Sequence, residues 1–599
     1  VMPREVITIQ VGQCGNQIGC RFWDLVLREH AHASRGAPVY DAALSSFFRN
    51  VDSRFSDAAD LPVGDGLRTL KARALLVDME EGVVNSLLTG PLADVFDAQQ
   101  LITDVSGSGN NWAHGHHVYG PQYKESIEEK LRRAAERCDS LQAFFLLHSL
   151  GGGTGSGLGT FLLENLEDWY PEVFRFVSCV CPSQNDDVVT SPYNTTLALR
   201  VLINSAHCVL PVSNDALVSI CNQISSRDAN GANQASLTDL PQDERPRRTC
   251  SSAGQQNTSS RRPPHPPGKS GSPQAGIEAR GNAEAPSRSR RNSHSAPPSK
   301  RMGQSSQQNE GTATHSEASN HAARDVPAGG AAASLGGIGV EKPFDRMNSL
   351  VAHLLNNLTS SMRFEGSLNL DLNEITMNLV PFPRMHFLLS SMSPLYFGKD
   401  PRLISRGFHQ TFTDALAPGH QLMNVDPRGS TYLAMAFLVR GSTSISDVNH
   451  NVARIRKQLK MLPCNEDAFK IGLCSVPPKG LPYSVLSLAN SCAAHHLFSQ
   501  NLRVFNRLYS KKAMVHHYTK YVEREIFDEA FETVNTLMKD YIHLDMLQET
   551  PASCAGSHSP PIDSAASLLF APSAWASQCA LAGPTSQSGL QSFLPRPVI

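Results

Sequence analysis

The residues best suited to chemistry lie in a glycine-rich stretch, HSLGGGTGSGLGTFLLENL, which runs from His148 to Leu166. Glycines expose backbone amides, and the helix-like run that follows adds its free N-terminal amides, so the stretch could bind phosphate. A Walker A loop also needs a lysine, but the sequence has no lysine between Lys130 and Lys269. The dinucleotide fingerprint G-x-G-x-x-G fails in every register. Any phosphate bound here must be held by backbone amides and a helix end.

Further loops carry polar residues that suit a nucleotide. GQCGNQ, residues 12–17, opens a helix whose N-terminal amides and dipole favour an anion. VDMEE places Asp78 and Glu80 on one side of an extended chain, and paired carboxylates suit Mg²⁺. SGSGNNWA, residues 106–113, adds flexible backbone, and Asp187 in NDDVVTSPYN could accept a hydrogen bond from a ribose hydroxyl. Several such loops on one chain favour a nucleotide site over a single structural turn.

Strands and helices alternate from Arg4 to about Asn222, which would bring these loops together. EVITIQVG precedes GNQIGCRFWDLVLREH, LQAFFLLHSL precedes FLLENLEDWY, and FRFVSCVCP precedes PYNTTLALRVLINS. This alternation predicts an α/β fold, with a parallel sheet covered by helices on both faces. Ligands of such sheets bind outside the carboxyl ends of the strands, where each of these loops begins.

Composition divides the rest of the chain. Residues 225–342 are rich in Ser, Pro, Gly and Arg, so they cannot bury enough apolar surface to offset the entropy of ordering, and we expect a disordered insertion. Residues 549–599 are similar, and we expect a disordered tail. The ordered parts are predicted to be a nucleotide-binding domain (2–224), a helix linking the domains (343–365), an α+β domain (366–490) and a region that is helical throughout (491–548).

Composition also argues against several classes of partner. The net charge of -2 at pH 7 disfavours nucleic acid and anionic membranes as partners. The 13 cysteines are scattered, and only Cys179 and Cys181 come close together, so neither zinc-site spacing nor a disulfide framework is visible. No apolar run reaches the roughly 18 residues of a membrane span. We therefore expect a protein of the reduced cytoplasm.

The loop sequences resemble those of the tubulin family. GQCGNQIG, GNNWA, GGGTGSG, PYN and NLVPFPR occur in the order found in that family. FWDLVLREH, SSFFRNVD, LITDVSGSGNNWA and RFEGSLNLDLNEITMNLVPFP are similar to the ε subfamily. The resemblance implies a tubulin/FtsZ-like fold, in which a Rossmann-like GTPase domain is followed by an intermediate domain with a mixed sheet and by C-terminal helices.

The same resemblance implies GTP or GDP as the ligand, together with Mg²⁺. Glu80 and Asp78 would organise the metal ion, and Asp187 would contact the ribose. Asn214 and Asn348 would bind the guanine, and Phe344 would stack on it. The phosphates would lie against Gln13, Cys14, Gly109, Asn110, Ser149, Gly152, Gly153, Thr154, Gly155 and Ser156. One departure is Ser191, since many relatives have glutamate before PYN.

Hydrolysis is a separate question, because tubulins cleave GTP when the next subunit supplies an acidic residue that positions water. In LNLDLNEITMN, Glu374 matches that residue, and Asp371 is expected one helical turn before it on the same helix face. The resemblance thus implies that this chain acts on the GTP of a neighbouring subunit. Its own GTPase activity would need an adjacent subunit.

Two functions follow from the resemblance. The favoured one is a GTP-binding cytoskeletal protein that acts in centriole and basal body assembly and organises compound microtubules, with α-, β- and δ-tubulin and centriolar proteins as partners. It would reside in the cytoplasm, at the cytoskeleton and centrosome. The alternative is a non-polymerising structural adaptor that pairs with δ-tubulin. A metabolic dinucleotide enzyme is disfavoured, because the fingerprint is missing.

Overall fold

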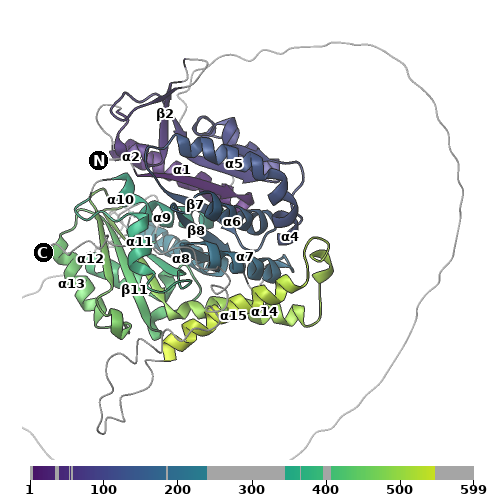
Figure 1. Ribbon diagram of the computed structural model, residues 1–599. Helices are drawn as coiled ribbons and strands as arrows, with labels where there is room; N and C mark the ends of the chain where they lie inside the picture. The colour runs from purple at the N-terminus through teal and green to yellow at the C-terminus, as the bar shows by residue number, and fades with distance from the viewer. Residues whose placement is uncertain are drawn as a thin grey trace, which may run out of the picture. The chain divides into compact units, whose positions relative to one another are not determined.

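Six parallel strands form the central sheet of the N-terminal half in the computed structural model of the chain (Figure 1). Their interiors are almost wholly buried and apolar, as expected for strands covered on both faces. This confirms the predicted parallel sheet. The strands lie in the order β6 (Leu101–Thr103), β5 (Ala74–Asp78), β1 (Glu5–Val11), β7 (Leu141–Ser149), β8 (Phe174–Cys181) and β9 (Cys208–Ser213).

Helices connect these strands and begin close to where the strands end. The structure describes residues 4–33, 39–52, 54, 59–183, 186–238, 344–364, 366–395 and 407–546. Two wide helical turns, Gly115–Tyr119 and Thr154–Leu158, precede α5 and α6. The helices of this half are α1 (Gly12–Ala33), α2 (Ala42–Ser45), α3 (Glu81–Leu88), α4 (Trp112–His114), α5 (Gly120–Glu136), α6 (Gly159–Trp169), α7 (Ser191–Ser205) and α8 (Asn214–Thr238).

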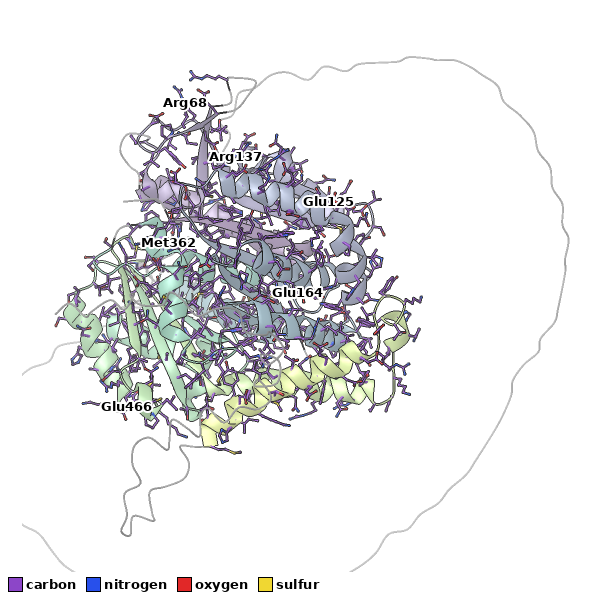
Figure 2. All side chains as sticks on the ribbon, in the orientation of Figure 1. Arg68, Glu125, Arg137, Glu164, Met362 and Glu466 are labelled. Carbon is purple, nitrogen blue, oxygen red and sulfur yellow. The ribbon has the colours of Figure 1, made fainter. Side chains whose placement is uncertain are left out.

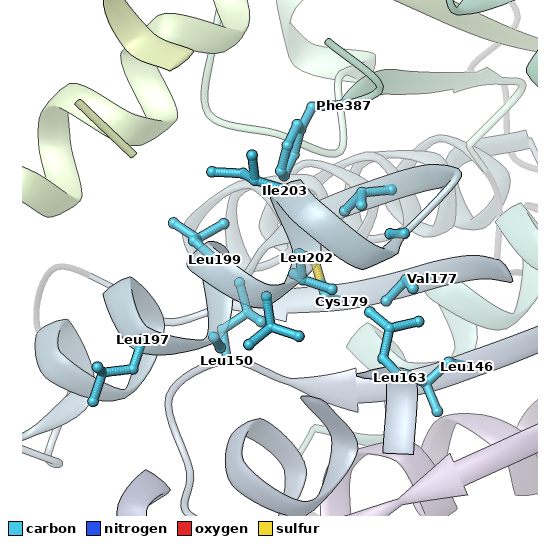
Figure 3. Close-up of a cluster of buried hydrophobic side chains, with 14 of the residues drawn as sticks. Leu146, Leu150, Leu163, Val177, Cys179, Leu197, Leu199, Leu202, Ile203 and Phe387 are labelled. Carbon is cyan, nitrogen blue, oxygen red and sulfur yellow. The ribbon is translucent and has the colours of Figure 1, made fainter. Parts of the chain in front are cut away.

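Two apolar cores lie on opposite faces of the central sheet. On one face α1, α8 and α9 (Asp345–Leu358) pack against the strands. On the other face α5, α6 and α7 pack, together with α14 (His495–Tyr509) and α15 (Glu525–Met546). Figure 3 shows part of this second core, where Leu199, Leu202 and Ile203 of α7 lie near Phe387. Helices thus cover both faces of the sheet.

A second, mixed sheet follows the linking helix, as predicted. Its order is β10 (Leu388–Ser393), β13 (Tyr483–Ser491), β11 (Tyr432–Gly441) and β12 (Phe469–Cys474). β11 pairs with β12 in parallel, and the other two pairs are antiparallel. Val209 of β9 donates a backbone hydrogen bond to His386 O at 3.0 Å, which joins the two sheets. The helices around this sheet are α11 (Leu372–Leu379), α12 (Phe408–Ala415) and α13 (Ile445–Arg456).

The C-terminal region departs from the prediction of helix throughout. α14 and α15 are separated by a turn in which Lys512 and Met514 have positive φ angles of 52° and 60°, which an α-helix cannot accommodate. Tyr193 of α7 donates a hydrogen bond to Ala513 O at 2.8 Å, and Tyr518 donates one to Asn194 Oδ1 at 2.6 Å. These contacts with α7 stabilise the turn, although the local sequence favours helix.

Other boundaries also differ from the predictions. The helix expected over 343–365 ends at Leu358, and α10 (Ser360–Arg363) follows it as a separate short helix. α8 continues to Thr238, so it extends past residue 225, where the insertion was predicted to begin. A three-stranded antiparallel sheet of β2 (Phe48–Asp52), β3 (Ala59–Leu61) and β4 (Thr69–Ala72) was not predicted. The rest of the predicted insertion and the tail at 549–599 lie outside the described residues.

A buried ion network links α1 to the second half of the fold. Glu29 of α1 lies 3.3 Å from the guanidinium of Arg363 and 3.0 Å from that of Arg440 on β11. Burial raises the pKa of Glu29, but the two guanidinium groups outweigh burial and lower this pKa to about 2. The first residue of α1 lies at the carboxyl edge of the central sheet, whereas Glu29 near its end contacts Arg363 and Arg440 of the second half of the fold. None of the helices in the described ranges is long and apolar enough to cross a membrane.

Candidate nucleotide site

A cavity of about 350 Å³ lies where β1, β5, β7 and β8 end. This is the edge of a parallel sheet at which ligands bind. Most of the residues predicted for a nucleotide site line it, although they come from distant parts of the sequence. They are Gln13, Cys14, Asp78, Glu80, Gly109, Asn110, Ser149, Gly152, Gly153, Thr154, Gly155, Asn214, Phe344 and Asn348.

The glycine loop is packed so closely that side chains are excluded at defined positions. A Cβ atom on Gly153 would lie 2.3 Å from Ser108 Oγ and 2.5 Å from the backbone nitrogen of Asn111. A Cβ on Gly157 would lie 2.3 Å from Trp112 O. The Ser108 and Thr154 hydroxyl oxygens are 3.0 Å apart, within hydrogen-bond distance. The loop is therefore closely packed against its neighbours, with its glycine backbone free of side chains, which suits backbone recognition of phosphate.

Ser156 is the member of the predicted phosphate set that the structure places outside the cavity lining. Its side chain is buried, and its hydroxyl donates to Gly152 O. It stabilises the loop from beneath. A direct contact between Ser156 and phosphate stays a prediction.

The start of α1 forms a second wall of the cavity. Gly12 has a φ of 73°, and a Cβ there would lie 3.1 Å from the backbone nitrogen of Gly155. Asn16 donates to Gly12 O at 3.0 Å and to Val77 O at 3.3 Å, which fixes the turn between β1 and α1. Burial raises the pKa of Cys14 to about 12, so its thiol stays neutral near pH 7. Cys14 is therefore a packing group rather than a nucleophile.

Two carboxylates on the β5 edge suit a divalent cation. Asp78 is 3% exposed, and among the described residues its Oδ2 has no hydrogen-bond partner. Burial raises its pKa to about 6, and the charge of Glu80 acts in the same direction, although backbone hydrogen bonds oppose them. Gly107 leaves room for Glu80, because a Cβ there would lie 2.2 Å from Glu80 Oε1. A bound cation would satisfy the buried oxygen.

Protein side chains alone would not complete a metal site here. The described part of the chain contains no group of three or more His, Cys, Asp or Glu side chains placed to hold a metal ion. Mg²⁺ usually keeps several waters and binds through one or two carboxylates together with phosphate oxygens. The pair Asp78 and Glu80 therefore fits Mg²⁺ that arrives with a nucleotide.

The far end of the cavity is shaped to hold a flat ring. Asn214 is the first residue of α8, and Phe344 and Asn348 lie at the start of α9. Phe344 is 62% exposed and has a φ of 69°, so an apolar ring is presented at an open edge. Asn348 donates to Gln17 Oε1 at 3.2 Å. The structure thus brings together residues from either side of the stretch 239–343, as the resemblance implied.

Asp186, rather than the predicted Asp187, lines the cavity on the side of the β8–α7 loop. Asp187 is exposed and does not line the cavity, whereas Asp186 lines it. Ser191, the residue at which this chain departs from many tubulins, donates from its hydroxyl to Asp186 Oδ2 at 3.0 Å. The structure therefore supplies a carboxylate on this side of the cavity through Asp186, and the ribose contact assigned to Asp187 stays a prediction.

Glu374 and Asp371 do not line the cavity, and their side chains make different contacts. Asp371 precedes α11 as its N-cap, accepts from the Glu374 backbone N–H at 2.9 Å, and pairs with Arg4 at 2.8 Å. This corrects the expectation that both carboxylates share a helix face, and both oxygens of Asp371 are already engaged. Glu374 lies in the first turn of α11, with its side chain 43% exposed, and pairs with Lys470 at 3.1 Å. Glu374 is thus the carboxylate that a neighbour could meet.

Sequence reasoning missed several residues that line the cavity. Gln17 follows Gln13 by one helical turn on α1, and Val351 follows Asn348 by three residues on α9, so helical spacing could have identified them. Residues such as Leu217 show no such signal, because only the tertiary fold brings α8 to the cavity. The cavity-lining residues that were not among the predicted site residues include Gln17, Ile18, Ser108, Val180, Pro182, Asp186, Val188, Leu217, Met347 and Val351.

The burial of His148 beneath the glycine loop predicts that acid lowers the stability of the fold. His148 is fully buried, and burial lowers its pKa from 6.5 to about 4. The unfolded chain accepts this proton near pH 6.5, whereas the native state accepts it only near pH 4. The neutral, buried His148 therefore contributes its full share of the free energy of unfolding above pH 6.5, and this contribution is lost as the pH falls toward 4. In urea unfolding, the free energy of unfolding should be about 2 kcal/mol lower at pH 5 than at pH 7 because of this residue. His148→Phe should reduce the difference by that amount, and an unchanged difference would contradict this assignment.

Comparison with known proteins agrees with the geometry. The family model for the Tubulin/FtsZ family, GTPase domain, matches residues 5–222, and the model for the Tubulin C-terminal domain matches residues 383–503. The Tubulin epsilon chains of Mus musculus and Homo sapiens are each 44% identical to this chain, over 91% of it and 97% of their own length. The Tubulin alpha-3 chain of Saccharomyces cerevisiae is 28% identical over 90% of this chain and 98% of its own length.

These matches bear directly on the ligand and the fold. The GTPase-domain match spans all six strands of the central sheet and the loops that follow β1, β5, β7 and β8, so it implies that this site binds GTP or GDP. The predicted tubulin/FtsZ-like fold is confirmed, with its mixed second sheet and C-terminal helices. With both models matched and epsilon chains aligned over 91% of its length, the chain belongs to the tubulin family.

Proposed function

We propose that the chain binds GTP together with Mg²⁺ in the cavity at the edge of the central sheet. The observation that carries this proposal is that one cavity joins a closely packed glycine loop, the carboxylates of buried Asp78 and exposed Glu80, and an end lined by Phe344 and two asparagines. The phosphates would lie between Gln13 and the loop Gly152–Gly155, and the guanine between Phe344 and the two asparagines. The charge of the metal ion would take the place of the lysine that a Walker A loop supplies.

Each part of the chain has a binding task in this arrangement. The backbone amides of the glycine loop and of α1 would donate to phosphate oxygens. Asn214 and Asn348 would recognise the guanine by hydrogen bonds, and Phe344 would cover one ring face. The carboxylates of Asp78, which is buried, and Glu80, which is exposed, would hold Mg²⁺, which supplies positive charge at the phosphates when it is bound. Together these residues would retain the nucleotide and fix its orientation in the cavity.

The metal assignment makes a direct prediction for Asp78→Asn. The amide keeps the size of the side chain but removes the charge that Mg²⁺ needs. GTP affinity measured in millimolar Mg²⁺ should fall by about tenfold, and GTP affinity measured in EDTA should stay unchanged. A variant that keeps the same Mg²⁺ dependence as the wild type would contradict the assignment. Asp65→Asn, on an exposed loop outside the cavity, is the matched control.

The nucleotide itself is tested by extraction from purified protein. Chromatography of the released nucleotide should show GTP or GDP. Recovery of NAD or ATP would contradict the guanine assignment to Asn214 and Asn348. Replacing Asn348 by alanine should then lower the preference for GTP over ATP by about tenfold, since a lost base hydrogen bond costs roughly 1 to 2 kcal/mol.

We further propose that the chain acts at centrioles and basal bodies, where it would organise compound microtubules. The proposal starts from the similarity to Tubulin epsilon chains, which are 44% identical over 91% of this chain. Its partners would be α-, β- and δ-tubulin and centriolar proteins, and its location the cytoplasm, cytoskeleton and centrosome. Localisation of a tagged full-length chain tests this directly, because uniform cytoplasmic fluorescence would contradict it.

A non-polymerising adaptor that pairs with δ-tubulin is the second candidate. Its supporting observation is the segment after Gln548, which contains Glu549 and Asp563 as its only carboxylates and so differs from a strongly acidic tail. GTP turnover with and without purified tubulin dimers distinguishes the two functions. An adaptor should show no partner-dependent hydrolysis, whereas a polymer subunit should show it.

A further inference from the structure

A basic hollow lies at the opposite end of α5 from the nucleotide site. It has a volume of about 30 Å³, and cationic residues dominate its lining: Arg49 on β2, Arg73 before β5, Lys130 and Arg133 on α5, and Arg137 directly after α5. Two glutamines and an alanine complete the lining, so none of these described residues carries a negative charge. Figure 2 labels Arg137 at the end of α5 beside the three-stranded sheet.

Two of the five cations form a fixed floor. Arg73 is 6% exposed and donates to Glu5 Oε1 at 3.1 Å, to Ser45 O at 2.9 Å and to Arg137 O at 2.7 Å. Arg49 is also 6% exposed and pairs with Asp60 at 3.0 Å and with Asp97 at 2.9 Å. These contacts explain the two buried arginines as parts of the fold. They do not explain the three cations above them.

The other three cations, Lys130 and Arg133 on α5 and Arg137 at its C-cap, keep unused hydrogen-bond donors. The Arg137 guanidinium makes no hydrogen bond or ion pair within the described ranges. Arg133 donates to Glu129 through Nε alone, and Lys130 uses one donor on Leu101 O at 2.9 Å. Burial lowers the pKa of Lys130, and the charge of Arg133 acts in the same direction, which indicates a positive potential at this rim. Such a rim attracts an anion.

We propose that this hollow binds a glutamate-rich or aspartate-rich peptide segment of a partner protein. Arginine forks match the planar geometry of a carboxylate. The volume of about 30 Å³ corresponds to about two water-sized spheres, which is room for a carboxylate group but not for a ring. No aromatic side chain lines the hollow, so it lacks the stacking surface of a single-strand nucleic acid site.

The occupant proposed for this hollow is a segment of another protein rather than residues 549–599 of this chain. The chain's own segment after Gln548 carries Glu549 and Asp563 as its only carboxylates, so it cannot present an acidic run. The hollow is also separate from the nucleotide cavity, because the two share no lining residue. Failure of this proposal would therefore leave the nucleotide site unaffected.

The test is fluorescence anisotropy with a fluorescein-labelled hexaglutamate peptide and the full chain in its GDP-bound form. We expect binding with a Kd of tens of micromolar in 50 mM salt, weakened by 200 mM salt. The double variant Arg133→Gln with Arg137→Gln should bind about tenfold more weakly. Arg503→Gln with Arg507→Gln is the matched control: it changes the same charges at the same spacing on α14, outside the hollow.

Three results would overturn the proposal. The first is equal binding of the peptide by the wild type and the Arg133/Arg137 double variant. The second is an equal loss in the Arg503/Arg507 control, because this would mean that net charge alone attracts the peptide. The third is displacement of the peptide by a short single-stranded RNA at lower concentration than by unlabelled hexaglutamate, which would assign the hollow to nucleic acid instead.

Discussion

Nucleotide binding is expected to be lost when Gly153 is replaced by alanine. The added Cβ would lie 2.5 Å from the backbone nitrogen of Asn111 and 2.3 Å from Ser108 Oγ, and the backbone contact cannot be relieved by a side-chain rotation. The glycine loop must then move away from the loop that contains Ser108. Because both loops line the cavity, this movement would misplace amides that donate to phosphate. GTP affinity should fall by at least about 1000-fold, or roughly 4 kcal/mol.

Two other glycines, Gly152 in the same loop and Gly82 on α3, provide controls for this result. A Cβ on Gly152, which also lines the cavity, would meet its nearest atom, Ser149 Oγ, at 3.5 Å, an ordinary contact. A Cβ on Gly82 of α3 would meet nothing within 4 Å. Both alanine variants should elute from gel filtration as the wild type does, and Gly82→Ala should release the same amount of nucleotide. If Gly153→Ala also retained nucleotide, the close packing of the loop would not be what shapes the site.

The phosphate end of the site could be predicted from sequence because strand ends fix it. Each parallel strand delivers its following loop to the same edge of the sheet, so identifying the strands places loops such as those at Gly12 and Gly153. The carboxylate pair Asp78 and Glu80 follows from the same rule. No knowledge of side-chain packing is needed for these residues.

The base end could be predicted only by resemblance. Asn214 and Asn348 come from helices on either side of residues 239–343, and no local pattern states that α8 and α9 meet at one cavity. That Asp186 lines the cavity and Asp187 does not has a similar cause. Two adjacent aspartates in a loop have no periodicity, so only the hydrogen bond from Ser191 selects which carboxylate faces inward.

The C-terminal region shows how tertiary contacts override local preference. Residues 497–548 have helical spacing of apolar residues throughout, yet the chain turns after α14. The positive φ angles of Lys512 and Met514 are locally unfavourable. The hydrogen bond from Tyr518 to Asn194, together with packing of Tyr193 against Phe527, holds the turn against α7. These partners are more than 300 residues apart in sequence, so a local pattern cannot reveal them.

Glu374→Ala is expected to abolish partner-dependent hydrolysis without affecting the chain's own nucleotide. Glu374 does not line the cavity, so GTP affinity should be unchanged. Its carboxylate is 43% exposed on α11, and Met377 of the same helix is 76% exposed, so this helix presents a surface that a second subunit could cover. Loss of a group that orients the attacking water typically lowers the rate by about 100- to 10,000-fold. Single-turnover GTP hydrolysis in the presence of purified tubulin dimers measures this effect.

Asp371→Asn separates the role of Glu374 from that of the helix cap. Asparagine caps a helix as well as aspartate does, so α11 should keep its geometry although the ion pair with Arg4 is weakened. Partner-dependent turnover should therefore stay within about threefold of the wild type, since both Asp371 oxygens are engaged inside the chain. Equal losses in both variants would mean that Asp371 also acts on the neighbour's GTP. Full turnover in Glu374→Ala would exclude the proposed role in trans, and absence of turnover in the wild type would favour the adaptor that pairs with δ-tubulin.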